Sequence, residues 1–570
     1  MMNLDLRAFP LALFFLATLS FASASLNAQS CDCPPLGDRP VETLTDNAGL
    51  GTGSRTLTCD TLWLLDGFVY VNDGDSLTVD PGTIIQAKEG QGFGASALIT
   101  ARGGKILADG TADCPIVFTF DGDPVNGSMP YNVNGLWGGL ILNGNGILNT
   151  MDGDDWAEGI VDDSGANRDV YGGSDNEDDS GVLRYVSIRH GGSEMPNPPV
   201  NFNNVVNGDE TNGLSLNGVG SATIIDNLEV VSTLDDGIQI MGGAVNMTHV
   251  AIAFSTEDNL EYDQGWVGNV QYLFSVLDQA EMTGEHGGDY EGDDFEFQDV
   301  TLSFLPYTNP LIINQTSFGH AGATGIRWHN GGGGRIQNSI WEHWQQGIDF
   351  EDNDPCDAYE LFLFGELTIR NNRFWDIGDS TSLDEMVLYE GPVWNGAETI
   401  QTHFVDESNL AEDQGVDAEF NALAGVIIDP LNPIPTSAAN VPPPYIPLDP
   451  FFEQVDYVGA FAPDQENWLA WSYLNELQLF GSTDLPGCTY SFACNFDASA
   501  NLDDGTCELA SCAGCTYPDA DNYDPSALLD DGSCTGFSGT NNCPTDIDGD
   551  GSTTVSDLLT VLALFGEACN

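Results

Sequence analysis

The chain has 570 residues, with 88 acidic side chains against 13 lysines and arginines, so its formal net charge at pH 7 is −75. This balance argues against binding to nucleic-acid phosphates or to anionic lipid, because both need cationic side chains. The chain is longer than one ordinary domain of ~100–200 residues. Its 66 glycines and low charged fraction of 18% favour a turn-rich β protein over a helical one.

The first segment has the features of an export signal. Leu11–Phe21 is an apolar run that is too short to span a bilayer, and small residues follow it as far as Ala28. This pattern is typical of a secretory signal peptide cleaved after about Ala28. A lipid anchor on Cys31 is the alternative, although the residues before it form a weak lipidation motif. No later segment is apolar enough to span a membrane, so we expect an extracellular or outer cell-surface protein.

Residues from about 60 to 400 consist of short β-prone runs separated by polar turns. Thr211–Leu216, Asp235–Ile240 and Glu257–Tyr262 align with each other at offsets of 24 and 22 residues. Thr324–Trp328 aligns with Gln346–Phe350 at an offset of 22. One short strand after each polar turn, at this period, predicts the coils of a right-handed parallel β-helix. A flat β-sandwich array is the second option, and Asn-Gly, Asp-Gly and Gly-Gly pairs are expected at the corners.

The aligned coils place acidic residues in a stack at one turn position. Asn212, Asp236 and Asp258 share that position, and Asp235 and Glu257 lie beside them. Adjacent coils are ~4.8 Å apart, and carboxylates this close repel unless a cation, a shared proton or solvent intervenes.

No lysine or arginine lies between His190 and Ile326 to neutralise these acids. Three interpretations remain open: a solvated acidic face, a structural calcium site, or catalytic carboxylates. In the third, Asp236 and Asp258 are the candidate pair, because glycoside hydrolysis needs two carboxylates ~5 to ~9.5 Å apart. Polysaccharide lyases, which usually pair calcium with a Lys or Arg base, would have to use a later arginine such as Arg327.

Other motifs in the body of the chain point to a family. They are Val69–Val71, Leu77–Ile85, Ala108–Thr119, Leu136–Leu140, Val170–Gly173, Ser180–Arg189 and Phe451–Phe461. Together they resemble secreted β-helix proteins of Bacteroidetes and other marine bacteria, over roughly residues 60–475. The resemblance implies a β-helix fold and export, and it implies no activity. Trp328, Trp341 and Trp344 could stack on sugar rings, but core packing is the favoured role.

Two cysteine-framed repeats follow, 27 residues apart, at Gly487–Cys507 and Gly514–Cys534. The second repeat lacks the equivalents of both Cys494 and Cys512, which is expected if those two are partners. We therefore predict the disulfides Cys488–Cys507, Cys494–Cys512 and Cys515–Cys534. Modules this small need such bonds because they bury little core. They resemble short repeats near the C-termini of large secreted proteins of marine Bacteroidetes, which implies a spacer or surface module.

The pairing of the remaining cysteines is less constrained. Cys543 and Cys569 flank the last module and are predicted to pair. The pairing of Cys31, Cys33, Cys59, Cys114 and Cys356 stays open. One option joins Cys59 to Cys114 and leaves Cys356 unpaired, since the total of 13 is odd.

The C-terminal module fits a twelve-residue calcium loop. Its predicted ligands are Asp546, Asp548, Asp550, Ser552, Thr554 and Asp557. A hard cation takes six to eight oxygens, which alternate residues of such a loop can supply. The apolar segment Leu558–Phe565 would form the helix after it. Asp at the last position resembles dockerins, but dockerins have two loops and this chain ends after one, which argues against a cohesin partner.

The sequence thus predicts a mainly β protein, whose parallel β-helix precedes small disulfide-stapled modules and a calcium-loop helix. Its expected parts are a signal peptide (1–28), an N-terminal cap (29–58), the β-helix (59–428), a Pro-rich strap with a packing segment (429–480), Cys repeats at 487–512 and 513–535, and the calcium module (543–570). We expect a secreted structural, adhesive or glycan-binding protein with Ca²⁺ as its cofactor. The alternative is a carbohydrate-active enzyme that uses the carboxylates of the helix face.

Overall fold

The computed structural model describes residues 31–162, 164–194, 210–292, 305–351, 365–378, 406–436, 446–463 and 467–480, with short pieces between and after them. It divides the chain into two units. The first comprises Met1–Ala418, Ala424–Val426 and Ile434–Tyr473, and the second comprises the rest. Among the described residues, no helix is long and apolar enough to cross a membrane.

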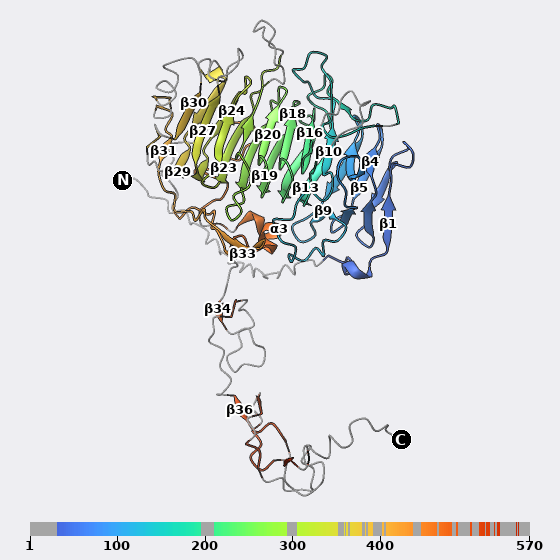
Figure 1. Ribbon diagram of the computed structural model, residues 1–570, viewed down its shortest axis with the longest axis vertical. Coiled ribbons are helices and arrows are strands. Elements are labelled where there is room, and N and C mark those ends of the chain that lie inside the picture. Colours follow the sequence, from blue (N-terminus) through green and yellow to red (C-terminus); the bar gives the residue numbers. More distant parts are fainter. Residues whose placement is uncertain are drawn as a thin grey trace, which may run out of the picture. The chain divides into compact units, whose positions relative to one another are not determined.

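The first unit is a parallel β-helix whose strands stack into two long sheets (Figure 1). In the part of the chain that the structure describes, sheet B has ten strands: β4 (Phe68–Val71), β7 (Ala97–Thr100), β10 (Leu140–Asn143), β16 (Leu214–Asn217), β18 (Ile238–Met241), β20 (Leu260–Asp263), β22 (Asp289–Tyr290), β24 (Thr324–Trp328), β27 (Gln346–Glu351) and β30 (Val387–Glu390). Each pairs in parallel with the strand of the next coil, so one coil contributes one rung.

Sheet A contains the strands that complete each coil. They are β1 (Val41–Leu44), β2 (Arg55–Leu57), β3 (Leu62–Leu65), β5 (Ser76–Val79), β6 (Ile84–Ala87), β8 (Lys105–Asp109), β9 (Ile116–Phe120), β13 (Gly181–Arg189), β17 (Ile224–Val231), β19 (Asn246–Ala253), β21 (Asn269–Val276), β23 (Leu311–Phe318), β25 (Gly334–Gln337), β26 (Ile340–Trp344), β28 (Leu367–Arg370), β29 (Arg373–Ile377) and β31 (Leu410–Ala411).

Shorter elements lie outside these sheets. Two antiparallel pairs are β11 (Asp155–Trp156) with β12 (Val170–Tyr171), and β14 (Ser193–Glu194) with β15 (Glu210–Thr211). The other strands are β32 (Asn421–Leu423), β33 (Val426–Asp429), β34 (Pro486–Gly487), β35 (Leu502–Asp503), β36 (Ala513–Gly514) and β37 (Leu529–Asp530). Helical turns in the described part of the chain include η1 (Leu36–Asp38), η2 (Gly92–Gly94), η4 (Trp468–Trp471) and α3 (Tyr473–Glu476).

The observed register confirms the coil alignment predicted from the sequence. Leu214 pairs with Ile238, which pairs with Leu260. Further along, Ile326 pairs with Ile348. The offsets of 24 and 22 residues therefore mark true rungs of the solenoid.

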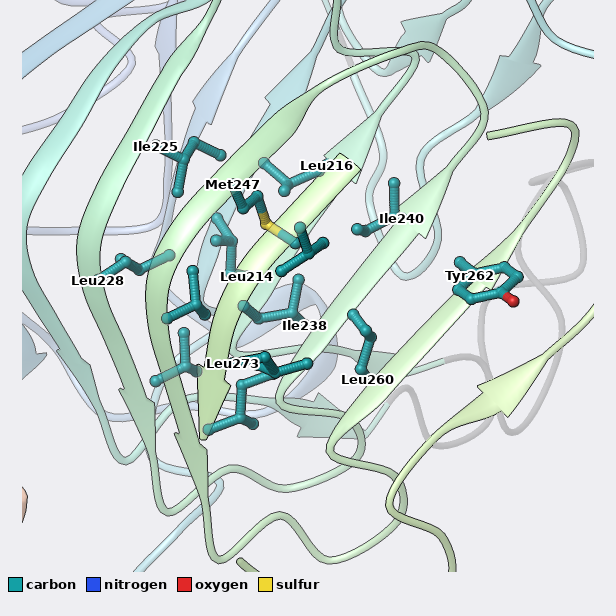
Figure 2. Close-up of a cluster of buried hydrophobic side chains, with 14 of the residues drawn as sticks. Leu214, Leu216, Ile225, Leu228, Ile238, Ile240, Met247, Leu260, Tyr262 and Leu273 are labelled. Carbon is teal, nitrogen blue, oxygen red and sulfur yellow. The ribbon is translucent and has the colours of Figure 1, made fainter. Parts of the chain in front are cut away.

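Successive side chains along each strand of sheet B point alternately into the core and toward the outer face. Leu214, Leu216, Ile238 and Ile240 all point into one apolar core between the sheets (Figure 2). The predicted core role of Trp328, Trp341 and Trp344 is confirmed, since each is at most 1% exposed. The intervening side chains of sheet B are left to face outward, where the candidate site lies.

Sheet A bends at one position that repeats from coil to coil. In β13, β17, β19, β21 and β23 a residue near the middle of the strand has a positive φ, and it falls at the same register point. These residues are Tyr185, Asn227, His249, Tyr272 and Asn314. Asparagine tolerates the left-handed conformation, whereas bulky residues rarely adopt it. Corners were expected at Gly-containing pairs, so the left-handed Tyr and His residues are a finding that the sequence did not predict.

Two disulfides fasten the N-terminal segment to the first coils. Cys31 is bonded to Cys114 and Cys33 to Cys59. The Cys59–Cys114 option is therefore wrong, because the segment before β1 brings both Cys31 and Cys33 beside Gly82, within bonding reach of Cys114 and Cys59. A thiol in a disulfide cannot also carry a lipid, which argues against the lipid-anchor alternative at Cys31.

In the second unit, Cys515 and Cys534 form a disulfide, the pair that comparison of the two repeats predicts. Cys512 is also disulfide-bonded. The other cysteines with predicted roles lie outside the described residues: Cys356, Cys488, Cys494, Cys507, Cys543 and Cys569.

Within the first unit, the segment 446–473 packs against the outer side of sheet A. Phe461 meets Phe274 edge to face at 5.5 Å between ring centroids, and it stacks with Trp468 at 5.6 Å. At the end of this segment, the Tyr473 backbone N–H donates to the Glu229 carboxylate at 2.6 Å. The guanidinium of Arg189 lies 4.1 Å from the centre of the Tyr473 ring, and all three side chains are buried.

Arg168 ties an acidic insertion to the start of the solenoid. Its guanidinium bonds Asp46 and Asp162, each at 2.6 Å, and lies 3.8 Å from the centre of the Tyr70 ring. We expect Arg168→Ala to destabilise the first unit by about 1.5–3 kcal/mol, the value of hydrogen bonds to charged groups. Arg168→Lys should recover only part of this, because a lysine cannot reproduce the two-pronged geometry. The midpoint of denaturant unfolding measures the effect, and equal midpoints for wild type and Arg168→Ala would contradict it.

Candidate functional site

The turns that precede the strands of sheet B are joined by a ladder of side chain to backbone bonds. The N–H of Asp236 donates to Asn212 Oδ1 at 3.2 Å, and the N–H of Asp258 donates to Asp236 Oδ1 at 2.8 Å. The predicted stack of Asn212, Asp236 and Asp258 is thus present. Each carboxylate holds the turn of the next coil, which gives these residues a structural role besides any chemical one.

The ladder continues to a residue that sequence alignment did not find. The N–H of His286 donates to Asp258 Oδ1 at 2.9 Å, and His286 Nδ1 lies 2.8 Å from the same oxygen. Burial lowers the proton affinity of His286, but the bond to Asp258 outweighs it, so the pKa of His286 is raised. Burial has the opposite effect on a carboxyl group, and it raises the pKa of Asp258 to about 6, although His286 opposes the shift.

The outward-facing residues of sheet B form the floor of the site. Gln239 pairs with Glu261, and Glu261 pairs with Asp289, at the same position on three successive rungs. The next rung contributes Arg327, whose Nη1 lies 3.3 Å from Asp289 Oδ2. Alternation places these side chains outside because their neighbours in each strand fill the core.

Insertions between coils build walls around this floor and form a partly open cavity of about 510 Å³, which we call the acidic cavity. The β11–β12 pair supplies one wall and β15 supplies another. Trp156, on the first wall, is 53% exposed. The described lining residues are Asp155, Trp156, Glu158, Tyr171, Glu210, Asn217, Asp235, Asp236, Gln239, Met241, Glu257, Asp258, Glu261, Asp263, Gln264, Asp289 and Glu291.

One side of the acidic cavity holds three carboxyl groups at close range. Ligand oxygens of Glu210, Asp235 and Glu257 all lie within 4.8 Å of one another. Burial and neighbouring acids raise the pKa of Glu210 to about 7 and raise those of Asp235 and Glu257. The three groups could hold a metal ion or share protons, since either removes the repulsion between like charges.

A pair of acids, separate from this cluster of three, also lines the cavity. The carboxyl groups of Asp236 and Glu261 hydrogen-bond to each other. Burial raises the pKa of Asp236, and it raises the pKa of Glu261 to about 8. Gln239 Nε2 also donates to Glu261 Oε2 at 3.0 Å. Burial therefore favours the protonated form of Glu261, while the hydrogen bond with Asp236 opposes the shift.

The pKa of Asp289, on the rung after Glu261, is shifted in the opposite direction. Burial disfavours its charge, but His329 Nε2 lies 3.0 Å from Oδ1, and His286 and Arg327 add positive charge. These partners hold the pKa of Asp289 below its ordinary value. Burial lowers the proton affinity of His329, but Asp289 and Glu291 outweigh it and raise its pKa to about 10. Neighbouring rungs thus carry one carboxyl of raised pKa and one of lowered pKa.

The raised pKa values make the stability of the site depend on pH. The folded pKa of Glu210, about 7, exceeds the unfolded value of ~4.3, so folding binds a proton and its contribution to stability is lost as pH rises between them. We expect Glu210→Gln to raise the thermal unfolding midpoint at pH 8 and to leave it unchanged at pH 4. The exposed Glu177→Gln is the control. A Glu210→Gln midpoint at pH 8 equal to or below that of wild type would contradict this expectation.

The sequence placed some of these residues and missed others. Asp236 and Asp258, the predicted catalytic candidates, both line the acidic cavity, and so do Asp235 and Glu257. Asp289 and Trp156 were not predicted from the sequence. Asp289 follows Glu261 by 28 residues instead of 22 or 24, which hid its rung, although the pair Asp289-Tyr290 repeats the acid-aromatic pattern of Glu261-Tyr262.

Most of the predicted calcium loop lies outside the described residues, namely Asp546, Asp548, Asp550 and Ser552. Thr554 and Asp557 are described, and the N–H of Thr554 donates to Asp557 Oδ2 at 2.6 Å while the N–H of Asp557 lies 3.2 Å from the Thr554 carbonyl oxygen. Bonds between a Thr and an acid three residues on are typical of a helix start. These contacts suit both a loop end and a helix cap.

Comparison with known proteins bears on the solenoid alone. No curated protein matches the chain. A family model described as a pectate-lyase-like β-helix domain matches residues 49–423, which contain every described strand of both long sheets after β1 and every residue of the acidic cavity. The chain therefore belongs to the family of pectate-lyase-like β-helix domains.

Proposed function

We propose that the acidic cavity binds a polysaccharide and hydrolyses its glycosidic bonds. The observation that carries this proposal is the pair Glu261 and Asp289, which occupy the same position on adjacent rungs and whose pKa values are shifted in opposite directions. Two carboxyl groups whose pKa values are pushed apart by their surroundings are the acid and base arrangement of glycosidases. An exposed tryptophan in the wall offers a face for a sugar ring.

The roles follow from the protonation states. Glu261, protonated at neutral pH, gives its proton to the leaving oxygen of the glycosidic bond. Asp289, ionised and held by His329 and Arg327, attacks the sugar carbon as that oxygen leaves. A water molecule then displaces Asp289 from the carbon and gives a proton to Glu261, which restores both carboxyl groups. Adjacent strands are ~4.8 Å apart, close to the ~5–5.5 Å separation of retaining enzymes. Asp236 positions Glu261 through their shared hydrogen bond.

The test is an incubation of the purified chain with a panel of marine and terrestrial polysaccharides, followed by measurement of new reducing ends. Hydrolysis of at least one polymer is expected. Products that absorb in the ultraviolet because of a new double bond would instead establish lyase chemistry and overturn the proposal. Arg327 is a poor base for that chemistry, because it is paired with Asp289 and a guanidinium stays protonated.

The second candidate is glycan binding or adhesion without catalysis. It is favoured by the ladder of Asn212, Asp236 and Asp258, which shows that part of the acid stack serves to hold turns together. The same panel separates the two functions. Retention of a polysaccharide without any new reducing end would support adhesion and exclude hydrolysis of that polymer.

We also propose that the chain is exported by its N-terminal segment to the cell exterior and that the C-terminal loop binds calcium. The six oxygen-bearing residues at alternate positions support calcium, and the disulfides support an oxidising compartment. In the full-length chain, Asp546→Ala together with Asp550→Ala should lower the calcium stoichiometry by one, measured by calorimetry after chelator treatment. Asp113→Ala with Asp121→Ala, both exposed acids of the solenoid, is the control. An unchanged stoichiometry would exclude the loop as a calcium site.

A further inference from the structure

The lining of the acidic cavity is so rich in acidic side chains that its charge restricts which ligands can bind. Eleven of its 17 described lining residues are Asp or Glu, and none of the 17 is Lys, Arg or His. The cations nearest to the floor, His286, Arg327 and His329, are engaged with Asp258, Asp289 and Glu291. A sugar polymer that carries carboxylate or sulfate groups would meet repulsion along this floor.

The cluster of Glu210, Asp235 and Glu257 lacks such pairing, although His286 is close enough to Glu257 to oppose the rise of its pKa. Glu210, Asp235 and Glu257 form no ion pair with any described lysine, arginine or histidine. They lie within 4.8 Å of one another beside the cavity space, and Trp156 stands exposed in the neighbouring wall. Clustered carboxylates near an exposed indole form a site for an organic ammonium group, which gains both ion pairing and a cation–π contact.

We propose that the polysaccharide of this site carries protonated amino groups, as in a polymer of glucosamine with free amines, and that Glu210, Asp235, Glu257 and Trp156 bind one of them. This inference rests on the proposed function, because it names the substrate class of the same cavity. The geometry supplies what a free amino sugar needs: a ring-stacking surface, carboxylates beyond those used for catalysis, and a 510 Å³ space between them.

The protonation of the cluster gives the proposal a second readout. Glu210, with a pKa of about 7, holds a proton for much of the time near neutral pH, and the pKa values of Asp235 and Glu257 are raised by burial and by neighbouring acids. An ammonium group that docks there replaces protons, so binding near neutral pH should release protons to the solution. Calorimetry in buffers of different ionisation enthalpy measures the number released.

The experiment compares three hexamers of equal length, made of glucosamine, N-acetylglucosamine and galacturonate, binding to Glu261→Gln protein so that turnover does not interfere. At pH 6 and low salt, the glucosamine hexamer should bind at least tenfold more tightly than the N-acetylated hexamer and should release protons. Added salt should weaken the binding of the glucosamine hexamer. Equal or tighter binding of the N-acetylated or galacturonate hexamer, with or without calcium, would overturn the proposal.

A variant pair locates the effect. Glu210→Gln with Glu257→Gln should weaken the glucosamine hexamer at least tenfold and abolish its advantage over the N-acetylated one. Glu89→Gln with Glu177→Gln removes two exposed acids outside the cavity and should change neither. Retained preference in the first double variant would overturn the assignment. Hexalysine binding as tightly as the glucosamine hexamer would show that charge alone, and not an amino sugar, is recognised.

Failure of the inference and failure of the proposed hydrolysis look different. If wild-type protein cleaves a neutral or N-acetylated polymer faster than the free-amine polymer, hydrolysis stands and the substrate class is wrong. If the glucosamine hexamer binds as predicted and wild-type protein cleaves no polymer, the recognition stands and catalysis is wrong.

Discussion

Glu261→Gln is expected to lower kcat/KM on the polysaccharide that the chain hydrolyses by about 10²–10⁴-fold, the usual contribution of a general acid. Glutamine keeps the size of the side chain and can still hydrogen-bond to Asp236, but it has no proton to give to the leaving oxygen. Binding should therefore change little, and the loss should appear in kcat. Reducing-end assays on both proteins over a range of substrate concentration measure the separate effects on kcat and KM.

The pH profile provides the second part of this prediction. Since the pKa of Glu261 is about 8, wild-type kcat/KM should hold near neutral pH and fall as the pH rises through 8. Asp289, with its lowered pKa, is already ionised throughout that range. Glu261→Gln should lose this basic limb and should retain more activity on an aryl glycoside, whose leaving group needs no proton. A variant that keeps more than a tenth of wild-type activity on the polymer would rule out Glu261 as the acid, and Glu177→Gln is the control.

The second large effect concerns the segment 446–473. Tyr473→Ala is expected to destabilise the first unit by about 3–5 kcal/mol, the cost of removing a buried aromatic ring. The ring is fully buried and lies against the guanidinium of Arg189, so its loss leaves a cavity beside a buried charge. The midpoint of denaturant unfolding, followed by tryptophan fluorescence, measures the effect, because Trp468 and Trp471 belong to the same segment.

Tyr473→Phe is the matched variant. It keeps the ring and loses only the hydroxyl, which donates to the Met129 carbonyl at 2.9 Å and lies 3.3 Å from His190 Nε2. We expect the loss of the hydroxyl to lower the free energy of unfolding by about 0.5–1.5 kcal/mol. Similar losses for the two variants would show that the hydroxyl, and not the ring, anchors the segment. Neither variant should alter the pH profile of catalysis, because Tyr473 does not line the acidic cavity.

The sequence predicted the solenoid well where consecutive coils have the same length. Offsets of 24 and 22 residues brought Thr211–Leu216, Asp235–Ile240 and Glu257–Tyr262 into their true register, because short turns leave the period intact. The same regularity placed Asp236 and Asp258 on one stack. The period fails after Glu261, where the rung of Asp289 follows a longer turn, and the ionised partner of the candidate pair was lost with it.

The walls of the site could not be predicted for a different reason. Trp156 and Glu210 come from insertions that are irregular in sequence, and only the folded chain brings them over rungs that lie much further along the sequence. Their positions depend on contacts such as those of Arg168 with Asp46 and Asp162. The left-handed Tyr185 and His249 are similar cases, because the stacked strands on both sides impose a conformation that the residues themselves disfavour.

The repeated bend of sheet A has a consequence for how such a chain can change in evolution. Because the left-handed residue falls at the same register point in each of five successive strands, a duplicated or deleted stretch of DNA that encodes one whole coil keeps every neighbouring corner aligned. A change of a few codons inside a strand would instead shift the corner against its neighbours. Whole coils, and loops placed between them, are therefore the units by which this protein could lengthen or remodel its binding surface.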